Sequence, residues 1–339
     1  MRDMKRIYIA SLHGTENKGG LERVVLNLKV ILSKQYEVKI LKKRDKEFKH
    51  GNWLLQSLLI SLKLFFVPNK IVIGNSWHSF LYPCDFTIHH GTMRGNSLHL
   101  DNDTLYTRRL AKMEAISAHV GKTVLAVGEN VKDELMEYYH VPEKKIIVLN
   151  NFVNDSVFFP NKMARVTSEN IKIIYAGRLD KGKGVAQLKR LSDFIETVSG
   201  FELHLACLSN NHTELFKDNM KTHIQIGVSP ENMTDFYNFG DIFYFPTQYE
   251  GFSMATLESL CCGVPVVGTK WAIGKELRNY DFVRICEEDD CEILLKEFQL
   301  MYERYNSFES RMFIHKTIAT NFGRENYERK VLELVRVRM

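Results

Sequence analysis

Residues 171–184, IKIIYAGRLDKGKG, join a run of apolar residues to a loop of glycines and basic residues. The run Ile171–Tyr175 has the composition of a buried β-strand, and a helical pattern follows at about 184–198. A strand that passes through a glycine-rich loop into a helix is the opening unit of a parallel, doubly wound sheet. This stretch therefore predicts an α/β domain that begins near residue 171.

The same alternation of short apolar runs and helical patterns extends along most of the chain. Because it begins near residue 6 and again near residue 171, we predict two doubly wound, Rossmann-like domains that face each other across a cleft. The polar stretch Asn161–Asn170 is the predicted linker. The expected strands are Arg6–Leu12, Glu37–Leu41, Lys70–Gly74, Phe86–His89, Thr123–Val127, Ile146–Leu149, Ile171–Tyr175, Glu202–Ala206, His223–Ile226, Ile242–Phe245 and Pro265–Val267. The expected helices are Leu21–Leu32, Trp53–Phe66, Thr104–Ala118, Asn130–Tyr139 and about 184–198, 212–219, 230–239, 253–262 and 290–304.

Length and composition fit this organisation. The 339 residues are enough for two domains, and 45% hydrophobic with 26% charged residues excludes a disordered or collagen-like chain. No apolar run reaches the roughly 18 residues that span a bilayer, and the charged start does not resemble a secretory leader. The six cysteines form no C-x-x-C pair, which suits a reducing compartment. We expect a cytoplasmic protein.

Charge is distributed unevenly between the two halves. Residues 1–165 hold 25 Lys and Arg against 16 Asp and Glu, whereas residues 166–339 hold 21 against 25. The basic excess is densest at 42–49, just before the apolar segment Trp53–Val67. Two interpretations stay open for 42–67: a solvated loop followed by a core helix, or a peripheral contact with an anionic membrane. No basic stretch is interleaved with aromatic residues, so we expect no nucleic-acid partner.

The loop after Ile171–Tyr175 resembles a phosphate-binding P-loop, but Gly184 stands where a P-loop needs a Ser or Thr to hold magnesium. We therefore reject a P-loop. Arg178 and Lys183 lie between a strand and a helix, and two fixed cations there can bind a diphosphate directly. The alternative is a pair of solvated loop cations.

A second candidate site spans Phe245–Glu258, where a strand passes through a loop into a helix. Glu250 falls in the loop, and Glu258 lies seven intervening residues later, in the helix. The backbone of Gly251, Phe252 and Ser253 offers N–H groups at a helix N-terminus, where phosphate or sugar oxygens bind readily. A carboxylate at Glu258 can accept hydrogen bonds from ribose hydroxyls. The alternative is an ordinary helix with an acidic first turn.

Two weaker signals lie in the first half. Gly19 and Gly20 precede the first helix and allow a ligand to approach the backbone closely. His89 and His90 end a strand without a third residue at metal-ligand spacing, so we expect one histidine to face a cleft and the other to be satisfied elsewhere.

Asp101-Asn102-Asp103 is a D-x-D tripeptide of the kind that holds manganese in metal-dependent glycosyltransferases. Here it precedes a helical pattern instead of following a strand. We expect Asp101 or Asp103 to be a helix N-cap.

Taken in order along the chain, these segments resemble the family 4 glycosyltransferases, retaining enzymes of the GT-B fold. KGGLERVVLNL, TIHHGT, AVGENVKDEL, VLNNFVNDSVFFP, YAGRLDKGKGV and EGFSMATLE are similar to successive segments of that family, and FGRENYERKVLELV is similar to its last helix. The resemblance implies domains at 1–160 and 165–319, with a helix at about 320–339 that packs back onto the first domain.

The resemblance also implies roles. Arg178 and Lys183 would neutralise the diphosphate leaving group without a metal or other cofactor. Glu250 and the segment Gly251–Met254 would hold the donor sugar, and Glu258 the ribose. His90 would lie near the reacting sugar, and Gly19 and Gly20 would line the acceptor side.

The implied activity is the retaining transfer of a hexose from a nucleotide-diphosphate sugar, UDP by the family's habit, to a hydroxyl of a glycan. An acceptor linked to lipid, as in bacterial capsule, lipopolysaccharide or exopolysaccharide synthesis, agrees with a peripheral location on the inner face of the membrane. A GT-B nucleotide-sugar epimerase and a non-catalytic, glycan-binding GT-B subunit remain alternatives. Trp271 departs from the family, which has small residues in that loop.

Overall fold

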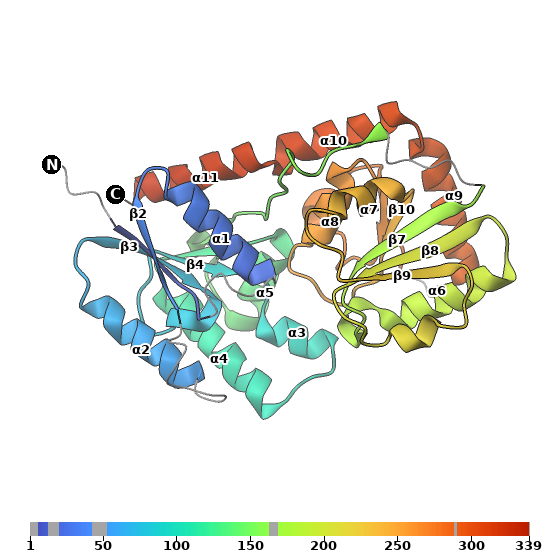
Figure 1. Ribbon diagram of the computed structural model, residues 1–339. Coiled ribbons are helices and arrows are strands. Elements are labelled where there is room, and N and C mark those ends of the chain that lie inside the picture. Colours follow the sequence, from blue (N-terminus) through green and yellow to red (C-terminus); the bar gives the residue numbers. More distant parts are fainter. Residues whose placement is uncertain (1–5, 13–19, 43–52, 163–168, 288–289, 339) are drawn as a thin grey trace. The chain divides into compact units, whose positions relative to one another are not determined.

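The computed structural model describes residues 6–12, 20–42, 53–162, 169–287 and 290–338, which form two compact units. Unit 1 comprises Met1–Asn151 with Tyr327–Met339, and unit 2 comprises Phe152–Asn326. The division at Asn151 lies before the stretch Asn161–Asn170, of which the structure describes only the ends. Each unit contains one parallel six-stranded sheet with helices on both faces (Figure 1).

The sheet of unit 1 has the strand order β2-β1-β3-β4-β5-β6. Its strands are β1 (Arg6–Ala10), β2 (Glu37–Leu41), β3 (Lys70–Asn75), β4 (Phe86–His89), β5 (Thr123–Ala126) and β6 (Ile146–Val148). Its helices are α1 (Gly20–Leu32), α2 (Trp53–Phe65), α3 (Met93–His99), α4 (Leu105–Val120), α5 (Glu129–Tyr139) and, from Tyr327 on, α11 (Arg324–Val337).

The sheet of unit 2 has the order β12-β11-β10-β7-β8-β9. Its strands are β7 (Ile171–Gly177), β8 (Phe201–Cys207), β9 (Thr222–Ile226), β10 (Ile242–Phe245), β11 (Val266–Gly268) and β12 (Val283–Ile285). Its helices are α6 (Val185–Thr197), α7 (Met233–Phe239), α8 (Met254–Cys261), α9 (Cys291–Tyr305) and α10 (Phe308–Phe322).

Both sheets form because their central strands are apolar on both faces. Ile7 and Ile9 in β1, and Ile173 and Ile174 in β7, have no exposed surface. Such strands need helices on each side, which the connections between parallel strands supply. In each sheet the strand order reverses direction beside the first strand, and ligands of open α/β sheets bind at the carboxyl ends of strands at such a point.

The structure corrects several sequence-based expectations. The helix expected at 212–219 is only a 3₁₀ turn, Thr213–Phe216. Helices α3 and α10 and strand β12 were not predicted. The expectation that Asp101 or Asp103 caps a helix is also wrong. Thr104 caps α4 and forms a reciprocal capping box with Thr107.

Candidate active site

Lys183 and Glu250 come together at the carboxyl ends of two neighbouring strands of unit 2. Lys183 follows β7, Glu250 follows β10, and β7 and β10 pair in parallel. The Lys183 ammonium donates a hydrogen bond to Glu250 Oε1 and lies 5.5 Å from the centre of the Phe245 ring. Both side chains are mostly buried, so this charged pair lies in a protected position.

The loops that carry this pair are tied to each other by hydrogen bonds. The Gly182 carbonyl accepts from the Gln248 backbone N–H at 2.8 Å and from the Thr247 hydroxyl at 3.0 Å. The Thr269 hydroxyl, after β11, donates to the Thr247 carbonyl at 2.6 Å. Thr247, Gln248 and Thr269 were not among the predicted site residues. Their signal in the sequence is their position directly after a strand.

Arg178 lies at the same edge of the sheet but is largely exposed. Its guanidinium Nε is 3.3 Å from Asp180 Oδ2, and the Tyr175 hydroxyl donates to its carbonyl at 2.6 Å. Asp180 Oδ1 also accepts from the Lys183 backbone N–H at 3.0 Å. The two predicted cations thus share one loop, whose backbone is fixed by Tyr175 and Asp180.

Steric constraints explain why residue 184 is a glycine, and they bear on the rejected P-loop. Its φ is +80°, in the left-handed region, and a Cβ there would lie 2.2 Å from the Pro246 carbonyl oxygen. Real Cβ atoms do not approach a backbone oxygen so closely, and only glycine adopts this conformation freely. The Ser or Thr that a P-loop needs therefore does not fit at this position.

The second glutamate of the predicted motif is buried in the helix. Ser253 caps α8 by accepting from the Thr256 backbone N–H at 3.1 Å, and Met254 is the first helical residue. Gly251 and Phe252 are buried before the cap, with the Phe252 ring against Phe322. Glu258 is only 6% exposed and accepts a hydrogen bond from the Tyr237 hydroxyl at 3.1 Å. Its assignment to ribose stays a prediction.

Trp271, the residue that departs from the family, packs beside the site. Its ring centre lies 5.6 Å from that of Tyr249, so the loops after β10 and β11 also meet through aromatic side chains. A bulky indole in this loop narrows the space at the strand ends.

In unit 1, His90 belongs to a chain of polar side chains that crosses three strand ends. Its Nε2 lies 2.9 Å from Asn75 Oδ1 at the end of β3, and the Asn75 amide donates to the Ser11 hydroxyl, after β1, at 3.3 Å. Burial lowers the pKa of His90 to about 4, so its imidazole is neutral at pH 7. Ser11 and Asn75 were missed, because their contact depends on strand order.

His89 does not have the partner that the sequence suggested. It has no exposed surface, and neither ring nitrogen has a hydrogen-bond partner among the described residues. Burial lowers its pKa to about 3 and keeps the ring neutral. The expectation that this histidine is satisfied elsewhere is therefore wrong.

Two buried carboxylates hold the segment that follows His90. Glu134 accepts from the Thr92 hydroxyl at 2.7 Å, and Glu114 accepts from the Met93 backbone N–H at 2.6 Å and the Tyr139 hydroxyl at 2.7 Å. Burial raises the pKa of Glu114 to about 7 although these bonds oppose the shift. The hydrogen bonds to Glu114 and Glu134 also explain how α3 begins although its sequence favours a helix only weakly.

The remaining first-half predictions are only partly described. Gly20 opens α1, and a Cβ there would meet nothing within 4 Å. Gly19 and the basic residues at 43–49 lie outside the described residues. Asp103, from the D-x-D tripeptide, pairs with Arg108 at 2.8 Å and Arg94 at 3.5 Å.

Helix α2 buries several polar residues and leaves several large apolar residues exposed. Gln56, Ser57 and Ser61 are buried beside Ile60 and Leu64. Five large apolar side chains on or next to the helix are exposed, up to 85% for the last: Leu54, Leu59, Leu62, Phe65 and Phe66. One side of the helix therefore packs in the core, through Ile60 and Leu64, while the other side is exposed. No helix among the described residues combines the length and apolar character needed to cross a bilayer.

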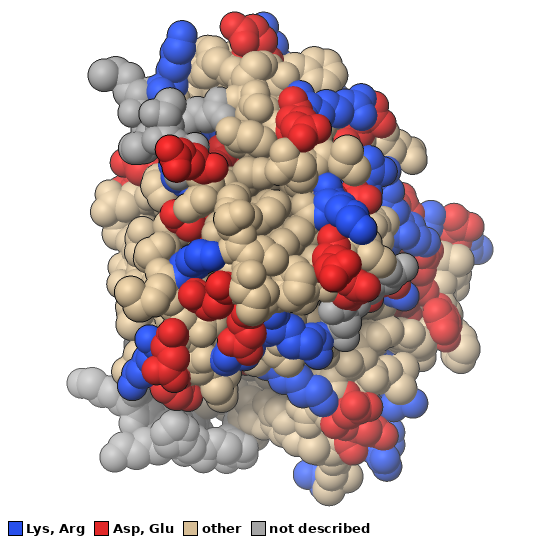
Figure 2. Space-filling model, turned by 90° about the vertical axis from the view of Figure 1, so that its right-hand side faces the viewer, with Lys and Arg blue, Asp and Glu red and all other residues tan. Residues whose placement is uncertain are grey.

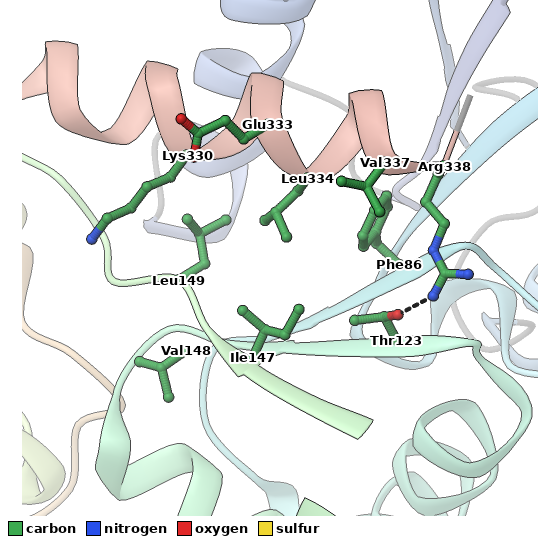
Figure 3. A pocket seen from close by; sticks show the side chains of 10 residues that line it. All are labelled: Phe86, Thr123, Ile147, Val148, Leu149, Lys330, Glu333, Leu334, Val337 and Arg338. Carbon is green, nitrogen blue, oxygen red and sulfur yellow. Dashed lines mark hydrogen bonds between the residues drawn. The ribbon is translucent and has the colours of Figure 1, made fainter. Parts of the chain in front are cut away.

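A cavity of about 400 Å³ lies in unit 1, and His90 is not among the residues that line it. Helix α11 covers it with Leu334 and Val337, while Phe86 and Thr123 begin β4 and β5 (Figure 3). The Arg338 guanidinium closes one side with a hydrogen bond to the Thr123 hydroxyl at 2.5 Å. This cavity therefore belongs to the packing of α11 on the sheet.

One face of the molecule carries basic and acidic side chains interspersed (Figure 2). A mixture of both signs is typical of a solvated surface and differs from the continuous basic face of a nucleic-acid-binding protein.

Known proteins resemble this chain at both the sequence and structure levels. Residues 170–304 match the family model described as Glycosyl transferases group 1. The match covers 135 of the 339 residues, so it shows a similarity of this segment to that family. The capsular polysaccharide biosynthesis glycosyltransferase CapM of Staphylococcus aureus is 27% identical over 46% of this chain and 46% of its own length. The alpha-galactosylglucosyldiacylglycerol synthase of Streptococcus pneumoniae is 24% identical over 57% of this chain and 54% of its own.

The chain spans about half the length of these curated relatives. Nearly the whole chain matches HepE of Anabaena, solved in complex with UDP and glucose, with a TM-score of 0.71, 11% identity and coverage of 98% of this chain and 100% of HepE. Together with the two parallel sheets, this confirms the predicted GT-B fold class. The matched family segment contains Arg178, Lys183, Glu250 and Glu258.

Proposed function

We propose that this protein transfers a hexose from a nucleotide-diphosphate sugar, with UDP as the nucleotide, to a hydroxyl of a glycan acceptor. The observation that carries the proposal is the Lys183–Glu250 pair, held by hydrogen-bonded loops at the carboxyl ends of β7 and β10. A protected cation beside a carboxylate can serve the two parts of such a donor, the diphosphate and the sugar hydroxyls. The relative that acts in capsular polysaccharide biosynthesis, and the UDP and glucose bound to HepE, support this class of substrate.

The proposed mechanism follows from where charge develops. Breaking the bond between the anomeric carbon and the donor phosphate oxygen places positive charge on the sugar and extra negative charge on the diphosphate. Arg178 and Lys183, with the N–H groups before α8, would stabilise that negative charge without a metal. The acceptor oxygen would attack the same face of the sugar and give its proton to the leaving phosphate, so that configuration is retained.

The other predicted residues have supporting roles in this proposal. Glu250 and the segment Gly251–Met254 would bind the donor sugar, and Glu258 the ribose. His90, neutral at pH 7, would hydrogen-bond sugar hydroxyls while Asn75 fixes its ring. Gly19 and Gly20 would line the acceptor side.

The proposal is tested by thermal unfolding with UDP, GDP, ADP and their sugars, each with and without EDTA. A ligand at 100 times its Kd adds about 2.7 kcal/mol of stability, so we expect a clear rise in Tm with uridine nucleotides that EDTA does not change. A shift that EDTA abolishes would contradict the metal-free site. No shift with any of the nucleotides would contradict the transferase assignment.

We also propose that the acceptor is linked to lipid and that the protein works peripherally on the cytoplasmic face of a membrane. The outward apolar side chains of α2 support this, since Leu62 and Phe66 flank the exposed cation Lys63. An apolar face with adjacent basic residues suits an anionic bilayer surface. The second relative, named for a diacylglycerol glycolipid, agrees with such an acceptor.

Replacing Leu62 and Phe66 together by Ser is expected to weaken binding to vesicles of anionic phospholipid at low salt by at least about 10-fold. Each side chain contributes about 1.5–3 kcal/mol when it is fully buried. The measurement is vesicle co-sedimentation, with Leu208→Ser/Met220→Ser as control, because those two apolar residues of unit 2 are also exposed, at 67% and 83%. Equal binding by both double variants would contradict the proposed contact.

A further inference from the structure

Three side chains with metal-ligating atoms gather on one face of the unit 2 sheet, apart from the candidate active site. Glu202 and His204 are two residues apart in β8, so they point to the same face. His223 in β9 lies directly opposite His204 in the parallel register. One ligand atom from each of the three lies within 4.8 Å of the others. The strand register itself therefore produces the cluster.

The spacing suits a small divalent ion. His204 Nε2 lies 3.2 Å from Glu202 Oε2. Bonds of about 2.0–2.2 Å in a tetrahedral zinc site place neighbouring ligand atoms roughly 3.3–3.6 Å apart. The rings of His204 and His223 are stacked, with centres 4.6 Å apart and planes 26° apart, and the His223 side chain is exposed.

The surroundings of the cluster also suit a metal ligand set. The Asn170 amide donates to Glu202 Oε1 at 2.8 Å and leaves Oε2 facing His204, as outer hydrogen bonds orient ligands in metal sites. His204 is nearly buried, so the surrounding side chains hold its ring in place. Lys172 lies opposite Glu202, with its ammonium 4.6 Å from the centre of the Phe239 ring. Its charge reduces the affinity of the cluster for a cation.

We propose that Glu202, His204 and His223 bind a divalent transition-metal ion, with Zn²⁺ as the first choice and water completing the coordination. Two imidazoles and one carboxylate suit zinc and its neighbours in the first transition row, whereas Mg²⁺ prefers oxygen ligands alone. The ion would join β8 to β9, the last strand of the sheet. It takes no part in the proposed sugar transfer, because Glu202 and His223 lie near the amino ends of their strands.

The test is Zn²⁺ binding to chain stripped with EDTA and dialysed, followed by calorimetry and by the visible spectrum of bound Co²⁺. We expect one ion per chain, a tetrahedral Co²⁺ spectrum without a thiolate band, and no response to Mg²⁺. His223→Ala is expected to weaken Zn²⁺ binding by about 100-fold or more. The exposed position of His223 makes it tolerant of substitution, and circular dichroism checks the fold.

His212→Ala is the matched control, because His212 is an exposed histidine of the same unit, 3.9 Å from Glu214. Loss of affinity in His223→Ala but not in His212→Ala supports the site. Equal affinity in the two variants, a thiolate band, or no stoichiometric binding would overturn it. Repeating the nucleotide and EDTA experiment on His223→Ala separates this site from the active site, since any effect of EDTA that acts through this ion disappears there.

Discussion

Lys183→Ala is expected to reduce turnover of the nucleotide sugar by about 100-fold or more at saturating donor. Removing one preorganised group that stabilises developing charge costs about 2.7–4 kcal/mol of transition-state stabilisation. In this protein the ammonium is mostly buried against Glu250 and the Phe245 ring, so water replaces it poorly. The measurement is the steady-state rate of nucleotide release with donor and acceptor present. Arg178→Ala, at the other cation of the loop, is expected to act in the same direction.

The matched control is Lys189→Ala. Lys189 also pairs with a carboxylate, Asp193, in the same unit, but this pair lies on the exposed side of α6. We expect its removal to leave turnover unchanged, because surface ion pairs contribute little. Near-normal turnover in both Lys183→Ala and Arg178→Ala would contradict the role assigned to the two cations.

Gly184→Ala is expected to lower the free energy of unfolding by about 2–4 kcal/mol. Two costs add at this position: the left-handed backbone that disfavours alanine, and the contact of its Cβ with the Pro246 carbonyl. Pro246 directly precedes the loop that holds Thr247 and Glu250. We therefore expect relief of the clash between residue 184 and Pro246 to move this loop away from the loop that holds Lys183. Urea unfolding measures the stability, and the nucleotide Tm shift reports the site.

Gly200→Ala separates these two costs. Gly200 has φ +88°, close to that of Gly184, but a Cβ there meets nothing within 4 Å. It therefore carries the backbone cost alone, about 1 kcal/mol. An equal loss of stability in the two variants would contradict the prediction, because it would show that the contact with Pro246 adds no cost.

The sequence predicts the sheets of this protein well because their strands are short, apolar and followed by glycine or polar residues. Phe86–His89 and Ile242–Phe245 have the predicted bounds. Strand β12 escapes prediction because its three residues include the charged Arg284 and only Val283 is buried, so they form no apolar run. Helix α3 escapes because Gly95 and Asn96 disfavour a helix, and buried Glu114 and Glu134, distant in sequence, hold its start.

The candidate site, too, could be predicted from the sequence only in part. The positions of Arg178, Lys183 and Glu250 follow from the rule that ligands bind at carboxyl strand ends. The contacts of His90 with Asn75, and of Lys183 with Glu250, depend on which strands are neighbours, which no local pattern contains. Helix α2 was difficult for a different reason: apolar residues surround it, so the sequence does not indicate which side is buried.

Helix α11 imposes an order of events on synthesis of the chain. Tyr327, Val331 and Val335 are buried in α11, and the residues from Tyr327 on belong to unit 1, whereas unit 2 is continuous from Phe152 to Asn326. Domains generally fold as they leave the ribosome, from the N-terminus onward. Unit 1 emerges first yet stays incomplete, with the apolar side chain of Phe86 uncovered, until all of unit 2 has been made. The first unit to be synthesised is therefore the last to be finished.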